Sequence, residues 1–257
     1  MGLNFAQHTV DESARFYEAV CEAGPEATVP TCDGWKAADL LWHLGEVQHF
    51  WGAIVSQRLT DISTYTRPPR PERWTDLQAF FLTASDTLLK ALASADDDVP
   101  VWTWFEAQRE VGFVRRRQAH EALIHRLDAE LAAGAVTPLD AELASDGVLE
   151  VIECIFGGLP SWAKRESQGA VGQISATDTG HRWLVRVDEW SGTSPDSGAD
   201  YVNEAILELV NSGDPVFEVS GAAADVDAWL WNRPTLGEVR VRGAADGLVT
   251  LVSNGVA

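Results

Sequence analysis

The segment from Arg115 to Glu130 constrains this chain more than any other. It contains no Gly or Pro, and Ala, Leu, Arg and Glu dominate it, so the sequence predicts the interior of a helix. Glu121 and His125 lie four residues apart, so on a helix they share one face, one turn apart. A carboxylate oxygen and an imidazole nitrogen in these positions can bind one divalent metal ion. His120 lies five residues from His125 and points away from it, so the segment is not a His-Glu-x-x-His zinc motif.

The four-residue spacing of Glu121 and His125 also fits an ion pair on the surface of a helix, which is the commoner origin of such a pattern. What favours a metal site is His43, far upstream in the chain. It lies in a helix predicted over residues 37–59, beside Leu40 and Leu44 of an apolar stripe at helical spacing. His43 therefore faces the interior or its edge, whereas His49, six residues on, points in another direction.

Composition and charge narrow the class of protein. The chain has 257 residues, of which 46% are hydrophobic and 23% charged, which is typical of one large folded domain or two ordinary ones. Its net charge of −20 argues against a nucleic-acid partner, because a nucleic-acid backbone requires a basic surface. No apolar run approaches the roughly 20 residues that span a bilayer, and residues 1–10 lack the features of a signal peptide.

The number and spacing of the cysteines indicate the redox environment of the protein. The three cysteines are odd in number and widely spaced, which gives no disulfide framework and fits a reducing environment. We therefore expect a cytoplasmic protein with no membrane partner, present as a monomer or a small homo-oligomer.

Helical periodicity extends over the first part of the chain. Helices are predicted over residues 9–23, 37–59, 76–94, 106–133 and 138–157. Four long helices with short to medium loops suggest an up-and-down bundle, and metal sites in bundles are built from side chains on facing helices. His43 on the second helix and Glu121 with His125 on the fourth fit that plan.

After about residue 170 the periodicity changes from that of helices to that of strands. Strands are predicted around residues 183–188, 216–219 and 238–242, helices over 222–231 and 244–252, and residues 201–211 fit either. We therefore expect the class α + (α+β), with a metal-binding helical bundle over about 1–165 and a smaller α+β domain over about 170–257.

Several segments of the chain resemble the mycothiol-dependent maleylpyruvate isomerase family. They are Thr31–Trp35, Ala38–Gly45, His120–Glu121, His125–Asp128 and Ala228–Arg233. The resemblance covers nearly the whole chain, and it implies a DinB-like metal-binding four-helix bundle followed by a domain similar to sterol-carrier proteins. Two positions depart from the family pattern, because Asp33 stands where a Pro is usual and Asn232 where a Gly is usual.

The resemblance also implies a site and a chemistry. His43, Glu121 and His125 would be zinc ligands, and three protein ligands leave a fourth position open for water, substrate or thiol. Nickel, iron and cobalt also suit such ligands. Mycothiol would be the thiol cosubstrate, and Arg233 would hold a carboxylate of the substrate, a role that suits a guanidinium.

The implied reaction begins with a metal-bound thiolate that adds to a small electrophile. Addition to a cis double bond leaves a single bond that can rotate, and elimination then returns the trans alkene. In an S-transferase the adduct is instead released or loses a leaving group. Two other functions stay open: a metal-dependent hydrolase of a small substrate or thiol conjugate, and a non-catalytic protein whose C-terminal domain holds an apolar ligand.

Some residues near these motifs have more than one interpretation. Asp128 would either orient a neighbouring side chain or carry an exposed helix charge, and exposure is the commoner case. Cys32 fits a packed turn residue better than a nucleophile. Arg115–Arg117 fits a solvated helix face better than an anion site, because the overall charge is strongly negative. Trp35 and Trp42 are the best candidates for pocket residues among the tryptophans.

Overall fold

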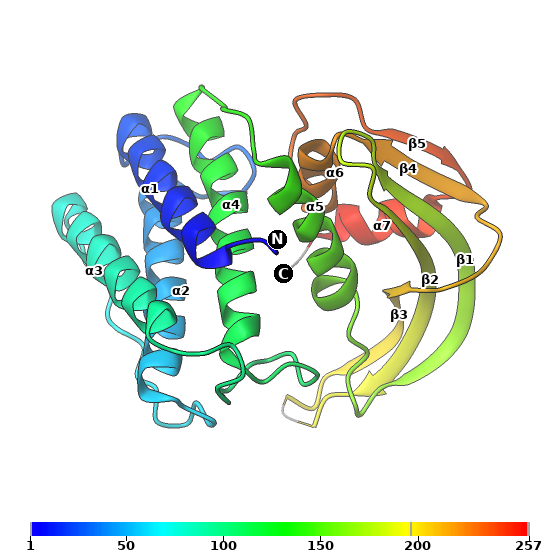
Figure 1. The fold of residues 1–257 in the computed structure, drawn as a ribbon, viewed down its shortest axis with the longest axis horizontal. Helices are drawn as coiled ribbons and strands as arrows, with labels where there is room; N and C mark the ends of the chain where they lie inside the picture. Colours follow the sequence, from blue (N-terminus) through cyan, green and yellow to red (C-terminus); the bar gives the residue numbers. More distant parts are fainter. Residues whose placement is uncertain (1, 196, 256–257) are drawn as a thin grey trace. The chain divides into compact units, whose positions relative to one another are not determined.

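The computed structural model describes residues 2–195 and 197–255, and the chain divides into two compact units, residues 1–138 and 139–257 (Figure 1). The first unit is a bundle of four helices, which are α1 (Phe5–Ala23), α2 (Ala37–Gln57), α3 (Trp74–Ala93) and α4 (Val111–Ala133). The second unit is a mixed sheet with helices. The expected fold class, a helical bundle followed by a smaller α+β part, is therefore confirmed.

The direction of the helices differs from the expected up-and-down bundle. α2 and α3 run parallel, since Gly45 lies against Phe80 and, further along both helices, Gly52 lies against Leu88. The expectation of strictly alternating directions was wrong because the connection over residues 58–73 is a crossover. At about 3.3 Å per extended residue, this segment is long enough to return along a 21-residue helix that rises about 1.5 Å per residue.

The pairing of α2 with α4 is the part of the bundle that matters for function. These two helices run antiparallel, because the ring of His43 contacts that of His125 while the ring of Trp51 contacts that of Phe113 nearer the other end. α4 begins at Val111 and not near residue 106 as predicted, and its end at Ala133 before Gly134 is as predicted. The sequences 37–59 and 106–133 thus do supply two facing helices.

The second unit is built on five strands in the order β3-β2-β1-β4-β5, with β1 and β4 parallel and the other neighbours antiparallel. Its strands are β1 (Lys164–Ala176), β2 (Arg182–Thr193), β3 (Asp200–Leu209), β4 (Phe217–Gly221) and β5 (Arg240–Gly243). Its helices are α5 (Ala141–Glu150), which continues into the π-helical turn η1 (Val151–Ile155), α6 (Ala223–Leu230) and α7 (Asp246–Asn254). The helices cover one face of the sheet and share an apolar core with it (Figure 1).

The division between the units falls earlier than the domain boundary expected near residues 165–170. α5 and η1 were expected in the first domain, but Val148 and Ile152 are buried in the same core cluster as Ile174 and Val185 of the sheet. Residues 139–165 therefore belong to the second unit. In the described part of the chain, no helix is long and apolar enough to cross a membrane.

Candidate metal centre

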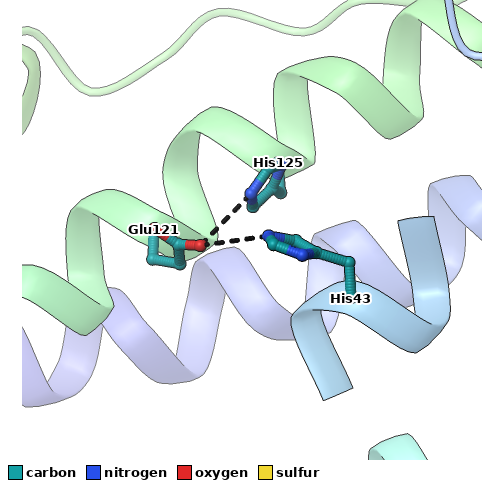
Figure 2. A group of neighbouring side chains, drawn as sticks. All are labelled: His43, Glu121 and His125. Carbon is teal, nitrogen blue, oxygen red and sulfur yellow. Dashed lines mark ion pairs between the residues drawn. The ribbon is translucent and has the colours of Figure 1, made fainter. Parts of the chain in front are cut away.

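Three side chains from α2 and α4 converge on one point of the first unit. Figure 2 shows His43 on α2 pointing toward Glu121 and His125 on α4. Nε2 of His125 lies 3.2 Å from Oε1 of Glu121, and Nε2 of His43 lies 3.5 Å from the same oxygen. The two imidazole rings meet edge to face, with their centroids 4.8 Å apart. The structure therefore brings together the three residues that the sequence analysis singled out.

The two separations measured from Oε1 of Glu121 are close to those of a tetrahedral metal site. With ligand bonds of about 2.0–2.1 Å, two ligand atoms of a tetrahedral zinc site lie about 3.4 Å apart. The observed separations of 3.2 and 3.5 Å match that value, and all three candidate ligand atoms lie within 4.8 Å of one another. Two imidazoles and a carboxylate also form a donor set suited to a divalent transition metal. The residues present therefore fit the group that the sequence pattern implies.

Arg117 fixes the charge of the carboxylate. Its Nη2 donates to Oε2 of Glu121 at 2.7 Å, which leaves Oε1 directed at the two histidines. Burial alone would raise the pKa of Glu121, but Arg117 and the histidines His125 and His43 more than offset burial and hold this pKa well below its usual range. Glu121 is therefore ionised at neutral pH and presents Oε1 to the two histidines.

Asp128 fixes the orientation of His125. Nδ1 of His125 donates to Oδ2 of Asp128 at 2.9 Å, so Nε2 is the ring atom directed at the site. Burial alone would lower the pKa of His125, but the hydrogen bonds to Asp128 and Glu121 raise it to about 9. Asp128 is fully buried, so its expected role as an exposed helix charge was wrong and the orienting role is the one observed.

The turn before α2 closes this arrangement on one side. Thr31 donates to Oδ1 of Asp128 at 2.5 Å, and Sγ of Cys32 lies 4.0 Å from Oδ2 of the same carboxylate. The ring of Trp35 packs against His43 with centroids 5.1 Å apart. The 31–35 motif thus lies beside the site because it holds the buried Asp128. Cys32 is a partly buried residue of this turn.

Several other candidates lie elsewhere. Trp42, expected as a pocket residue, packs on Phe80 with ring centroids 5.1 Å apart and lines none of the described pockets. The ring of His120 contacts that of Phe5, outside the candidate ligand set as expected. Arg233 lies in the second unit, where its Nη1 donates to the carbonyl of Trp231 at 2.7 Å. Its role in holding a substrate carboxylate stays a prediction.

Sequence reasoning missed the role of Arg117. The run Arg115–Arg117 was expected to form a solvated helix face, but Arg117 is only 4% exposed and Arg115 pairs with Asp97. A signal for Arg117 was present, because it lies four residues before Glu121 and therefore on the same helix face.

One of the two departures from the family pattern, Asn232 in place of Gly, is accommodated by the conformation of the backbone. Asn232 adopts the left-handed backbone conformation, with φ of +56°. Glycine populates this region freely, and asparagine is among the other residues that do so most readily. The replacement of Gly by Asn therefore keeps the turn before Arg233.

Comparison with known proteins agrees with this fold. Residues 6–130 match the family described as "Mycothiol maleylpyruvate isomerase N-terminal domain". A crystal structure titled as the mycothiol-dependent maleylpyruvate isomerase is similar with a TM-score of 0.59, and that of a histidine-to-alanine mutant with a TM-score of 0.61. Each is 12% identical to this chain, and each comparison covers 92% of this chain and 91% of the other. At that identity the likeness shows the fold alone. No curated protein sequence matches the chain.

Proposed function

Because residues 6–130 belong to the mycothiol maleylpyruvate isomerase N-terminal domain family, we propose that this chain is a metal-dependent enzyme that uses mycothiol to act on a small electrophile. The reaction would be cis–trans isomerisation or transfer of the thiol sulfur. The observation that carries the proposal is the convergence of His43, Glu121 and His125 on one point between two antiparallel helices.

The proposed metal is zinc, held by Nε2 of His43, Oε1 of Glu121 and Nε2 of His125. Support comes from the ligand types, from the two separations between Glu121 and the histidines, which are close to the tetrahedral value, and from the number of ligands. Three protein ligands are typical of catalytic zinc, whereas structural zinc has four. When bound, the metal would hold the sulfur of mycothiol as a thiolate at the remaining position.

Neighbouring side chains set the charge and the orientation of the proposed ligands. Arg117 keeps Glu121 ionised, and Asp128 holds the ring of His125 with Nε2 facing the site. The exposed fraction of the His43 side chain is 34%, against 9% for His125 and 16% for Glu121. The site is therefore most accessible on the side of His43, and Trp35 lies there as an aromatic wall.

The electrophile would be a carbon of a double bond conjugated to a carbonyl. The thiolate electron pair forms a carbon–sulfur bond, the double bond becomes single, and the displaced pair moves to the carbonyl oxygen. After rotation the pair returns and the sulfur leaves, which gives the trans alkene with no net redox change. The role proposed for Arg233, in the second unit, is carboxylate binding, which the paired N–H donors of a guanidinium suit.

An assay with defined reactants tests the proposal. The metal-loaded full chain is mixed with mycothiol and maleylpyruvate, and the trans isomer is quantified by chromatography. A parallel reaction uses an activated aryl halide and follows loss of free thiol, which measures S-transfer. We expect one of the two reactions to proceed, to require both thiol and metal, and to fall at least 100-fold in kcat/KM in Glu121→Gln.

Each other outcome contradicts a specific part of the proposal. Turnover of an ester or thiol conjugate without added thiol would replace the transferase or isomerase with a hydrolase. Reaction rates that are equal in wild type and Glu121→Gln would remove the metal centre from the mechanism.

A further inference from the structure

A cavity lies in the first unit, and none of the three candidate metal ligands lines it. It is bounded by α2, α3 and the crossover over residues 58–73, and its volume is about 400 Å³. Pockets for small molecules have volumes of about 300–1,000 Å³, so this one suits a compact ligand. The family resemblance and the metal centre do not account for it.

The walls of the cavity are held by specific contacts. Nδ1 of His49 on α2 is hydrogen-bonded to the hydroxyl of Tyr65 in the crossover, at 3.0 Å. The ring of His49 also stacks on Phe80 of α3, with centroids 5.7 Å apart. Beside the cavity, Arg67 of the crossover pairs with Glu46 of α2. The crossover is therefore fastened to α2 at two points, and the cavity exists before any ligand binds.

The chemistry of the lining is unusual for this chain. Charged residues make up 23% of the sequence, yet the described residues that line the cavity include no Asp, Glu, Lys or Arg. Hydroxyl and amide side chains take their place, including Ser56, Gln57, Thr64 and Thr66. A charged ligand would meet no carboxylate, ammonium or guanidinium group in this lining, so the lining favours an uncharged polar ligand.

Two of the hydroxyl groups have a defined hydrogen-bonding role. Thr83 donates its hydroxyl proton to the carbonyl of Ala79 at 2.8 Å, and Thr87 donates to the carbonyl of Thr83 at 2.8 Å. A hydroxyl has one proton and two lone pairs, so both oxygens remain acceptors toward the cavity. These two oxygens therefore suit a ligand that donates hydrogen bonds, while the amide of Gln57 offers both a donor and an acceptor.

Aromatic rings provide the remaining surface. Phe80, Tyr65 and His49 all line the cavity and are partly buried. Flat apolar rings next to hydrogen-bond acceptors match a ring-shaped molecule that has C–H groups on its face and hydroxyl groups on its rim. We propose that this cavity binds a small uncharged polyhydroxylated ring, a sugar or a cyclitol, with its face on Phe80 and its hydroxyls donating to Thr83 and Thr87.

Binding can be measured on the full chain by NMR with ¹⁵N labelling. The probes are methyl glucopyranoside and myo-inositol as neutral polyols, cyclohexanol as an apolar ring of similar size, and glucuronate as an anion. We expect at least one polyol to shift the amide signals of Tyr65, Thr83 and Thr87 saturably, and to bind at least fivefold more tightly than cyclohexanol and glucuronate.

A pair of matched variants locates the binding. Thr83→Val keeps the shape of the side chain but removes the acceptor, so we expect the polyol dissociation constant to rise at least fivefold. Thr75→Val makes the same change on the same helix outside the cavity and should leave it unchanged. His43→Ala should also leave it unchanged, so this result is independent of the proposed metal chemistry.

Three results would overturn the proposal. They are the absence of saturable shifts with either polyol, tighter binding of cyclohexanol or glucuronate than of the polyols, and equal polyol affinity in wild type and Thr83→Val.

Discussion

Arg117 and Asp128 set the protonation of Glu121 and His125, the two candidate metal ligands on α4. Arg117 keeps Glu121 ionised, so this ligand is ready at any pH near neutrality. Asp128 and Glu121 have the opposite effect on His125, because two carboxylates stabilise its protonated form and raise its pKa to about 9. A metal ion must therefore displace a proton from His125 before it can bind Nε2.

This competition predicts how metal affinity depends on pH. Below pH 9 most of the His125 is protonated, so each unit of falling pH should weaken metal binding about tenfold, and above pH 9 the affinity should level off. Competition titrations with a chromophoric chelator between pH 6.5 and 9.5 would measure this slope. Calorimetry in buffers of different ionisation enthalpy should show about one proton released per metal at pH 7. A flat profile would contradict the account.

The Asp128→Asn variant serves as the internal comparison for this prediction. It keeps the size of the side chain but removes its charge, so the pKa of His125 should fall and the pH slope should move to lower pH. Loss of the orienting carboxylate should also weaken metal binding at high pH by about 10–100-fold. Asp86→Asn, an exposed change on α3, should alter neither value.

At the scale of the elements, the packing of α2 on α3 determines where the crossover runs. A Cβ atom on Gly52 would lie 3.2 Å from the backbone nitrogen of Leu88 and 3.3 Å from its Cα, so a side chain there requires the helices to move apart by a few tenths of an ångström. We expect Gly52→Val to destabilise the protein by about 1–3 kcal/mol through overpacking.

Urea unfolding of Gly52→Val beside Ala53→Val would test this packing. Ala53 is the next residue on α2 and is only partly buried. The two methyl groups that Ala53→Val adds should therefore cost little stability there. Equal stability of the two variants would contradict the close parallel packing of α2 and α3.

The sequence predicted the helices well and their directions poorly. Apolar residues at helical spacing depend only on local geometry, so α1, α2, α3 and α4 were expected close to their observed bounds. Direction depends on the connections, and the Pro-rich segment before α3 gave no sign that it returns along the bundle. β1 was not expected because its pairing with β2 has two register shifts, and an irregular strand lacks clean alternation.

The residues of the candidate site also differ in how well the sequence predicted them. His43, Glu121 and His125 were found from spacing and from the resemblance, and the structure places them together. The role of Arg117 was not foreseen, and the orienting role of Asp128 was considered but not favoured, because a charged residue on a helix can face solvent or a buried partner. For Asp128 that choice depends on Thr31 of the 31–35 turn, which is distant in sequence.

At the scale of the whole molecule, the chain combines a helical bundle that carries the candidate metal site with a mixed-sheet unit that carries Arg233. The fold of the mycothiol-dependent maleylpyruvate isomerase is kept at 12% sequence identity. Conservation of the fold at that distance leaves room for a different electrophile, so the metal centre is the feature by which the proposed function is best judged.

Metal content is the measurement that tests this account most directly. Wild-type protein, His43→Ala and Glu121→Ala would be analysed by elemental mass spectrometry after dialysis, with His181→Ala as an exposed histidine control and thermal unfolding as a check of folding. We predict about one equivalent of divalent metal in wild type and the control, and none in the two ligand variants. Folded wild-type protein that carries no metal and binds none on addition of zinc, cobalt or nickel would contradict the central claim.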